Sequence, residues 1–179
     1  MGKIHMVLDA KDLARILDKM TQEIIDTHRQ MDKLALIGVH TRGVFIARRI
    51  QERILEQQGA SIETGAVDIN LYRDDWTRIG AQPVVRKSEI DFNIDGKKII
   101  LIDDVLFTGR TVRAAMDALM DFGRPARIEL AVLIDRGHRE LPIHANYIGQ
   151  TIKTTLGEAV NVLLAEFDGE DRVDVLPEK

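Results

Sequence analysis

Short, almost wholly apolar runs alternate in this sequence with longer stretches of helical periodicity, and this alternation limits the possible folds. The runs at 34–39 (LALIGV), 98–102 and 128–135 (IELAVLID) are long enough for strands and too short for most helices. Strands that are apolar on both faces lie between two layers, and their alternation with helices is typical of a parallel α/β sheet. We therefore predict one domain over residues 1–179, with helices on both faces of a mostly parallel sheet.

Local signals place three helices. Asp9 is a suitable N-cap residue, and apolar residues then recur at helical spacing over 13–24. A second apolar stripe covers 44–54 and ends near Gly59, and a third covers 112–119. Glycine is common just past the end of a helix, because its backbone adopts the left-handed conformation at little cost.

Composition excludes several classes of function. The chain contains no cysteine, which rules out disulfides and thiol catalysis and is typical of a reducing compartment, so we expect a cytoplasmic protein. Its apolar runs are far shorter than the roughly 20 residues that cross a bilayer. With 29 acidic and 25 basic residues the net charge is −4, so a general nucleic-acid coat is not expected, although a local basic patch is compatible with this charge.

The most informative motif is the stretch 99–111, IILIDDVLFTGRT. A buried strand ends there in two adjacent carboxylates, Asp103 and Asp104, and the turn 108–111 (TGRT) leads into the next helix. Ligands of parallel α/β sheets gather at the carboxyl ends of the strands, and the N–H groups of a helix start bind phosphate. The motif therefore indicates a sugar-phosphate site. Receiver domains and magnesium sites of nucleotide hydrolases share the paired acids and are the alternatives for these two residues. The chain lacks the GxxxxGK[ST] loop, which excludes only the P-loop hydrolases.

Two other segments suit such a site. In the turn 40–43 (HTRG), Arg42 is able to neutralise a leaving anion and Gly43 permits close backbone approach, although an ordinary turn with a solvated arginine is the alternative. Residues 67–72 alternate apolar and polar, which predicts a strand. The polar segment 73–96 shows no period, and irregular segments of this length are usually functional, so we expect a closing lid rather than a solvated loop.

Several segments together resemble the PyrR family of bifunctional pyrimidine-operon attenuation regulators and uracil phosphoribosyltransferases. The stretch 99–111 resembles the phosphoribosyl-diphosphate (PRPP) signature of type I phosphoribosyltransferases, and the similarity covers nearly the whole chain, weakening after about residue 150. The other matching segments are HTRG (40–43), DINLYRDD (68–75), GRTVRAAMDAL (109–119), GRPARIELAVLIDRGHRELPI (123–143) and YIG (147–149).

The resemblance implies a type I phosphoribosyltransferase fold, which is an α/β fold with a mostly parallel central sheet flanked by helices. It also implies a flexible lid at about 73–96 and a small hood. The hood and the base-binding segment would lie at about 135–179, together with parts of the N-terminus.

The resemblance further implies that uracil and PRPP react to give UMP and diphosphate. Asp103, Asp104 and Arg42 would be catalytic, and the two acids would hold Mg²⁺, the implied cofactor, mainly through PRPP. Binding of PRPP and UMP would involve Thr41, Arg42, Gly43, Asp103, Asp104, Val105, Leu106, Phe107, Thr108, Gly109, Arg110 and Thr111. The pyrimidine would be bound by Asp135, Arg136 and Val160, and the lid would act through Arg73, Asp74, Asp75 and Arg78.

A second function implied by the resemblance is binding of pyrimidine-gene leader RNA, promoted by the uridine nucleotides UMP and UTP. Lys11, Arg15 and Lys19 share one face of the first helix and, with His138 and Arg139, would form the RNA-binding surface. A solvated helix face is the alternative. Four residues depart from the family pattern and reduce the positive charge of this surface: Asp18, Gln22, His144 and Gln150. The alternatives are therefore an enzyme without RNA binding, or a regulator that uses the site only as a UMP or UTP sensor. A homodimer or larger homo-oligomer would place two basic rows on one face.

Overall fold

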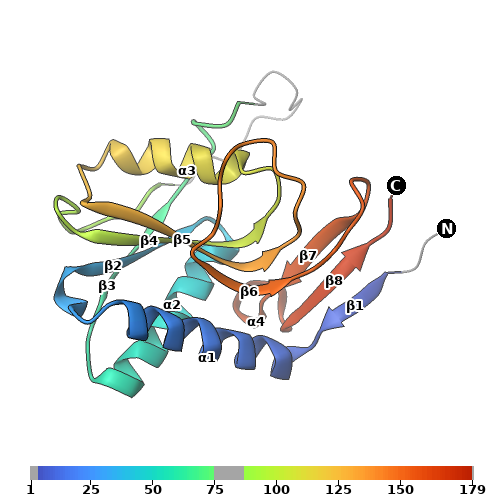
Figure 1. Cartoon of the computed structure of the whole chain (residues 1–179), viewed down its shortest axis with the longest axis horizontal. Coiled ribbons are helices and arrows are strands. Elements are labelled where there is room, and N and C mark those ends of the chain that lie inside the picture. The colour runs from blue at the N-terminus through green and yellow to red at the C-terminus, as the bar shows by residue number, and fades with distance from the viewer. Residues whose placement is uncertain (1–3, 75–86, 179) are drawn as a thin grey trace.

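The structure is a computed structural model, and it describes residues 4–74 and 87–178. Its centre is a five-stranded sheet whose paired strands all run parallel (Figure 1). The strand order is β3 (Glu63–Val67), β2 (Leu34–Val39), β4 (Lys98–Leu106), β5 (Arg127–Asp135) and β6 (Tyr147–Thr151). This arrangement confirms the expected α/β fold, and the apolar runs at 34–39, 98–102 and 128–135 lie in its three central strands.

Helices cover both faces of the sheet (Figure 1). The helices α1 (Ala10–Thr27) and α2 (Arg42–Gln58) pack on one face, and α3 (Arg110–Met120) packs on the other. Strand β4 serves both layers, because Ile100 and Ile102 join the core under α1 and α2, whereas Ile99 and Leu101 join the core under α3. A strand that is buried on both sides has no polar face, which explains its continuous apolar sequence.

A smaller antiparallel sheet lies beside the main one and corresponds in position to the expected hood (Figure 1). It consists of β1 (His5–Leu8), β8 (Arg172–Leu176) and β7 (Ala159–Leu163), in that order. The short helix α4 (Ala165–Asp168) connects β7 to β8. A 3₁₀ turn, η1 (Met31–Lys33), precedes β2. The first and last described strands therefore meet in one small sheet.

Glycines allow α2 to lie close to the sheet. A Cβ atom on Gly38 would come within 2.4 Å of the Val44 Cα atom, and one on Gly43 would come within 2.3 Å of the Ile102 carbonyl oxygen. Neither position accepts a side chain without moving the backbone. Gly43, which belongs to the HTRG motif, thus allows the start of α2 to pack against the end of β4 that carries Asp103 and Asp104. This packing role is independent of any contact with a ligand.

The segment between β3 and β4 differs from the sequence-based expectation. The strand ends at Val67 instead of continuing to residue 72, because the Asp68 side chain accepts a hydrogen bond from the Asn70 N–H and turns the chain. Beyond the gap, Glu89 forms an antiparallel bridge with Ala66, and Ile94 is fully buried under α3. Within the predicted lid, 73–96, Ile94 is thus a core residue and Ile90 and Phe92 pack against the same core, whereas Glu89, Asp91 and Asn93 are exposed.

In the ranges 4–74 and 87–178, none of the helices combines the length and the apolar character that a membrane span requires.

Candidate active site

The carboxyl ends of β2, β4 and β5 lie side by side at one edge of the parallel sheet. The register pairs Gly38 with Ile102, and Leu106 with Asp135. The turns that follow these three strands therefore border a common region, where parallel α/β sheets bind their ligands. The structure brings the predicted segments 40–43, 103–111 and 135–138 together at this edge.

The two adjacent acids have different surroundings. Asp103 is only 6% exposed, and its Oδ1 accepts a hydrogen bond of 2.9 Å from the Asp104 N–H. Asp104 is half-buried, and its Oδ1 accepts one of 2.8 Å from the Val105 N–H. Burial, and then the charge of Asp104, raise the pKa of Asp103 well above its ordinary value. An arriving cation would relieve this repulsion, so the pair is suited to a charged or hydroxyl-rich ligand.

The turn after β4 has the features of a phosphate cradle. Gly109 has a φ of 93°, and α3 begins directly after it. The Arg110 N–H donates to the Thr108 hydroxyl at 3.3 Å, and the N–H groups of the first helical turn have no carbonyl partner within their own helix. Their dipoles point toward an anion placed at the helix start.

The segment after β5 is attached to this turn. The Thr108 carbonyl oxygen accepts hydrogen bonds from the Glu140 and Leu141 N–H groups, at 2.9 and 3.1 Å. The Arg139 guanidinium donates to Asp135 Oδ2 at 2.5 Å and to the carbonyl oxygens of Phe107 and Ile143 at 2.8 and 3.0 Å. The phosphate turn and the predicted base-binding segment therefore form one connected unit.

An aromatic ring lies at the centre of this unit. The Arg136 guanidinium carbon lies 4.0 Å from the centroid of the Phe107 ring, and the guanidinium donates to the Thr154 hydroxyl and the Thr155 carbonyl. The His138 ring meets Phe107 edge-on, and its Nε2 lies 2.7 Å from the Thr154 carbonyl oxygen. These side chains hold the 135–138 turn in place. Because they are engaged in these contacts, the backbone N–H and C=O groups of the turn are the candidates for hydrogen bonds to a base.

Asp135 shapes the same turn. Its Oδ1 accepts from the Gly137 N–H at 2.9 Å, and its Oδ2 from Arg139. Burial opposes its charge, but the hydrogen bonds from Arg139 and from the Gly137 N–H outweigh burial and lower the pKa of Asp135. Val160 lies in β7 and packs against the same apolar cluster as Val105, so the hood reaches the end of β4.

Arg42 has a partner that sequence patterns did not reveal. It begins α2, directly after the N-cap Thr41, and it donates from Nε and Nη2 to both carboxylate oxygens of Asp168, at 3.0 and 2.7 Å. These hydrogen bonds raise the pKa of Arg42, and the charge of Asp104 acts in the same direction. Since 126 residues separate the two partners, no local signal connects them.

Part of the predicted lid contacts the phosphate turn. Arg110 forms ion pairs of 2.6 Å with both Asp74 and Glu140. A cavity of ≈340 Å³ opens here and is lined by Arg73, Asp74, Phe107, Thr108, Arg110 and Thr111. Asp75 and Arg78 lie outside the described residues.

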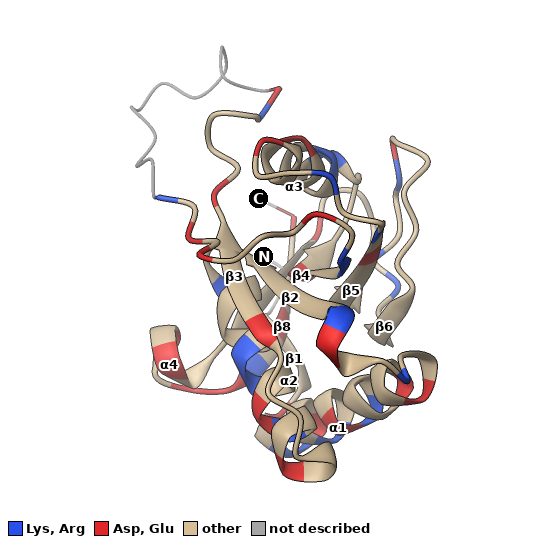
Figure 2. Cartoon of the chain, turned by 90° about the vertical axis from the view of Figure 1, so that its left-hand side faces the viewer, with Lys and Arg blue, Asp and Glu red and all other residues tan. Residues whose placement is uncertain are grey.

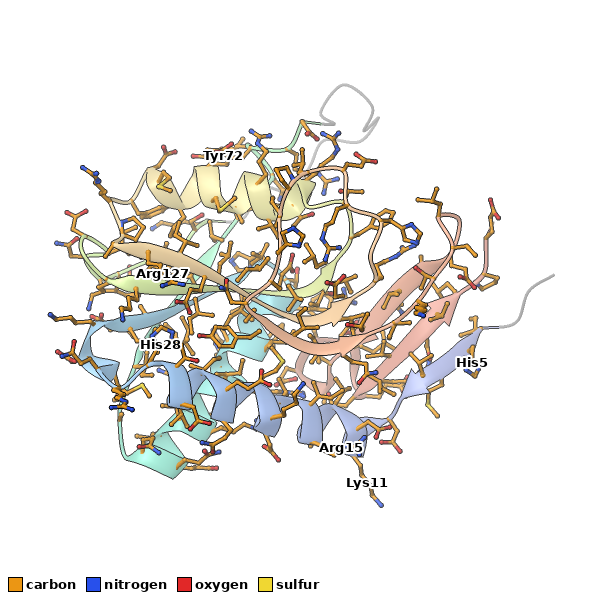
Figure 3. The ribbon with its side chains drawn as sticks, viewed as in Figure 1. His5, Lys11, Arg15, His28, Tyr72 and Arg127 are labelled. Atoms are coloured by element: carbon orange, nitrogen blue, oxygen red, sulfur yellow. The ribbon has the colours of Figure 1, made fainter. Side chains whose placement is uncertain are left out.

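The residues predicted to bind RNA fall into two different settings. Lys11, Arg15 and Lys19 are exposed on α1, and Figure 3 shows Lys11 and Arg15 pointing outward from the helix. Arg139, by contrast, is only 19% exposed and is bound to Asp135 and the phosphate turn, while His138 packs on Phe107. Both turn residues therefore have partners within the chain, and their part in an RNA surface stays a prediction.

The acids suit a magnesium ion that arrives with its ligand. Within residues 4–74 and 87–178, no group of three or more acidic or histidine side chains is arranged to hold a metal ion. The site offers two neighbouring carboxylates, one of them half-buried. Mg²⁺ commonly takes one or two carboxylates from a protein and further oxygens from substrate phosphates and water, so the donor set fits that mode.

Comparison with known proteins agrees with this geometry. A family model described as "Phosphoribosyl transferase domain" matches residues 3–164. The hypoxanthine phosphoribosyltransferase of Trypanosoma cruzi superposes with a TM-score of 0.72 at 14% identity, covering 98% of this chain and 97% of that one. A Staphylococcus aureus hypoxanthine phosphoribosyltransferase gives 0.71 at 18% identity, covering 97% and 92%. At such identities the superpositions support the fold alone. Together with the family match, they define the chain as a type I phosphoribosyltransferase.

More particular relatives are found by sequence. The "Bifunctional protein PyrR" of Desulfosudis oleivorans is 57% identical over 98% of this chain and 97% of its own length. The protein of the same name from Clostridioides difficile is 48% identical over 94% and 96%. The chain belongs to the PyrR family. The family resemblance, the fold class and phosphoribosyl transfer expected from the sequence are thereby confirmed.

Proposed function

We propose that the chain transfers the phosphoribosyl group of PRPP to uracil and also regulates pyrimidine genes by binding leader RNA in response to uridine nucleotides. Membership of a family whose members are named bifunctional supports two functions in one chain. The observation that carries the enzymatic part is the buried acid pair at the end of β4 next to the helix-start turn 108–111. That combination suits a ligand with both ribose hydroxyls and a phosphate.

Each end of PRPP has a matching set of groups. Asp103 and Asp104 accept hydrogen bonds from the ribose hydroxyls, and the N–H groups and hydroxyls of 108–111 hold the 5′-phosphate. Arg42, with Thr41 and Gly43, faces the diphosphate. Supporting this assignment, the start of α2 lies against the acid pair, since a Cβ atom on Gly43 would come within 3.3 Å of the Asp103 Cα atom.

In the reaction the bond between C1′ and the diphosphate oxygen breaks, and uracil N1 forms a bond to C1′ and releases its proton. Positive charge develops on the ribose and negative charge on the diphosphate. Mg²⁺ bound with PRPP supplies charge stabilisation of the leaving diphosphate. Arg42 adds a donor to the same anion, and the acid pair orients the sugar near the developing positive charge.

The pyrimidine is read mainly by backbone groups of 135–138. The side chains of Asp135, Arg136 and His138 are occupied in shaping this turn, which supports a backbone-reading pocket. Val160 of the hood adds an apolar contact. Arg73 and Asp74 border the cavity beside the phosphate turn, where a lid over the bound sugar phosphate would exclude water.

For RNA, the exposed row on α1 is the better-supported part of the predicted surface. Its charge is partly balanced, because Arg15 pairs with Asp12 at 2.7 Å and Lys19 with Glu23 at 3.6 Å. We therefore propose RNA binding that is weak and salt-sensitive, and that depends on two rows brought together in a homo-oligomer.

The direct test is an assay of UMP and diphosphate formation from uracil and PRPP with Mg²⁺. Replacing Asp103→Asn and Asp104→Asn together should leave a folded protein and lower the turnover by on the order of 100-fold or more, because groups that stabilise developing charge have effects of this size. A folded double variant with nearly parental turnover would disprove the assigned roles. Gel shifts of leader RNA with and without UMP test the regulatory part separately.

A further inference from the structure

The side chain of Arg42 is enclosed by the hood helix α4. Besides the two hydrogen bonds to Asp168, the Arg42 guanidinium carbon lies 5.5 Å from the centroid of the Phe167 ring. Only 26% of the Arg42 side chain and 13% of the Asp168 side chain are exposed. A bidentate pair with this little exposure fixes both the position and the plane of the guanidinium.

The helix α4 is itself firmly attached to α2 (Figure 2 shows the acidic α4 beside α2). Arg49, two turns along α2 from Arg42, binds Glu166 and Asp171 at 2.5 and 2.7 Å. The Phe167 ring stacks on Phe45 with 6.4 Å between centroids. Asp168 Oδ2 also accepts a hydrogen bond from the Leu164 N–H at 2.9 Å. The carboxylate that holds Arg42 is therefore not free to move.

A second carboxylate also acts on the charge of Arg42. The charge of Asp104 acts on Arg42 from the end of β4. We infer that, without Asp168, the Arg42 guanidinium would turn toward Asp104, one of the acids proposed to accept from the ribose. An ion pair there would occupy the ribose acceptor and remove Arg42 from the diphosphate at the same time.

The geometry points to Asp168 as a positioning residue for phosphoribosyl transfer: it holds Arg42 away from Asp104 with free donors directed at the diphosphate. Asp168 takes two of the five guanidinium N–H donors, so three remain for an anion. This inference rests on the proposed function, since it requires a diphosphate next to Arg42. Asp168 also lies beyond residues 3–164, the part that matches the general phosphoribosyltransferase model.

The affinity for diphosphate distinguishes a positioning role of Asp168 from simple competition. If Asp168 merely competes with the diphosphate for Arg42, removing its charge strengthens diphosphate binding, because a repelling anion is lost. If Asp168 positions Arg42, the same change weakens binding. The sign of the change in affinity therefore separates the two.

The experiment measures binding of magnesium pyrophosphate by calorimetry, together with KM values for PRPP and uracil. For Asp168→Asn we expect diphosphate affinity to fall about tenfold and KM for PRPP to rise similarly, by analogy with groups that orient metal ligands. KM for uracil should change little. The matched control is Asp171→Asn, which removes one of two acids from Arg49 while Glu166 keeps α4 attached; it should stay within about twofold of the parent.

A double-mutant cycle with Arg42→Lys tests whether the effect passes through Arg42, because the loss from Asp168→Asn should disappear when the fork-shaped guanidinium is absent. If Asp168→Asn does not fold, Asp168→Glu takes its place in the same cycle, since it keeps the charge and moves the carboxylate by one methylene. Unchanged or tighter diphosphate binding, or an equal loss in the Arg42→Lys background, overturns the inference. Absence of UMP formation by the parent protein would instead overturn the proposed function.

Discussion

At the scale of single residues, the buried Asp103 is proposed to bind the ribose, and its ionised form lowers the stability of the fold. A carboxyl group that is 6% exposed beside another carboxylate is favoured in its neutral form. In the unfolded chain the same group ionises near its ordinary pKa of 3.8. Because its folded pKa is raised, its favourable contribution to folding is complete below pH 3.8 and is lost as the pH rises through the folded value.

This linkage predicts that Asp103→Asn stabilises the protein at neutral pH while impairing catalysis. Asparagine keeps the oxygen that accepts from the Asp104 N–H and removes the buried charge. The free energy of unfolding, measured by denaturant titration from pH 3 to pH 8, should exceed that of the parent at neutral pH, and the difference should shrink as the pH approaches 3.8.

A suitable comparison for that measurement is Asp117→Asn, because Asp117 is an exposed acid of α3 paired with Arg113. Its effect should stay within about 0.5 kcal/mol. The interpretation of Asp103 is wrong if its asparagine variant is less stable than the parent at pH 7.

At the scale of elements, a buried polar cluster joins α1 to the starts of β5 and β6. His28 Nε2 lies 2.8 Å from Glu129 Oε2 and 3.0 Å from the Tyr147 hydroxyl, and that hydroxyl donates to Glu129 at 2.7 Å. In Figure 3, His28 and Arg127 lie at the end of the sheet away from the hood. The cluster is at the amino ends of the strands, so it acts on stability and is remote from the phosphate turn.

Replacing Tyr147→Phe should lower the free energy of unfolding by about 1–3 kcal/mol, because the buried Glu129 carboxylate loses a hydrogen-bond donor. The melting temperature reports this loss, and KM values should not change. Tyr72→Phe is the matched control, since the Tyr72 hydroxyl donates to the exposed Asp121 at the surface, where the loss should be below about 0.5 kcal/mol. Equal losses in the two variants would contradict a structural role for the cluster.

The same cluster predicts a pH dependence of stability. Burial opposes the charge of Glu129, but hydrogen bonds from Tyr147 and His28 outweigh it and lower the pKa of Glu129 below 4.5. Its contribution is therefore present above pH 4.5 and is lost as the pH falls through the lowered folded value. Burial, and then Glu129, raise the pKa of Tyr147 to about 12, so its contribution persists through neutral pH.

The helix α1 carries the prediction about RNA. Replacing Lys11→Glu and Arg15→Glu together should weaken leader-RNA binding and reduce its dependence on salt by roughly 1.5 units of the log–log slope, because each phosphate contact contributes about 0.7–0.9. Formation of UMP should be unaffected, since the row lies outside the proposed active site. The control, Arg113→Glu with Arg124→Glu, makes the same change in net charge elsewhere. If both pairs weaken binding equally, the effect is one of net charge and the row is not the surface.

At the scale of the whole molecule, the two sheets place the site at a junction. The parallel sheet supplies the acids and the phosphate turn, and the hood supplies Val160 and the counter-charge of Arg42. The hood also exposes Ile4 and Met6 at its β1 edge, and large exposed apolar side chains often mark contacts with other chains.

We expect a symmetric homo-oligomer in solution, with a mass at least twice the 20.2 kDa of the chain. Light scattering coupled to gel filtration measures this directly. A mass near 20 kDa over the whole micromolar range would contradict the expectation, and would also remove the means by which two α1 rows reach one RNA.

Features that depend on neighbours along the chain can be predicted from the amino-acid sequence. Burial of β2, β4 and β5 on both faces was evident in their continuous apolar runs, and the N-cap at Asp9 and the left-handed end at Gly59 followed from single residues. The acid pair and the phosphate turn were likewise visible, because they form one continuous stretch. The alternation at 67–72 predicts a strand to residue 72, but the strand ends at Val67, because the Asp68 side chain accepts a hydrogen bond from the Asn70 N–H and turns the chain.

Which distant charges meet depends on how the elements pack in three dimensions. The separation of Arg42 from Asp168 is 126 residues, and Arg139 is joined to Phe107 across 32. No periodicity or motif records such pairs, because they arise when packed helices and strands bring the ends of remote segments within hydrogen-bonding distance. The same packing buries Asp103 and thereby raises its pKa. Local sequence motifs thus indicate where the site is. The pKa values of its charged groups depend on the residues that the fold places beside them.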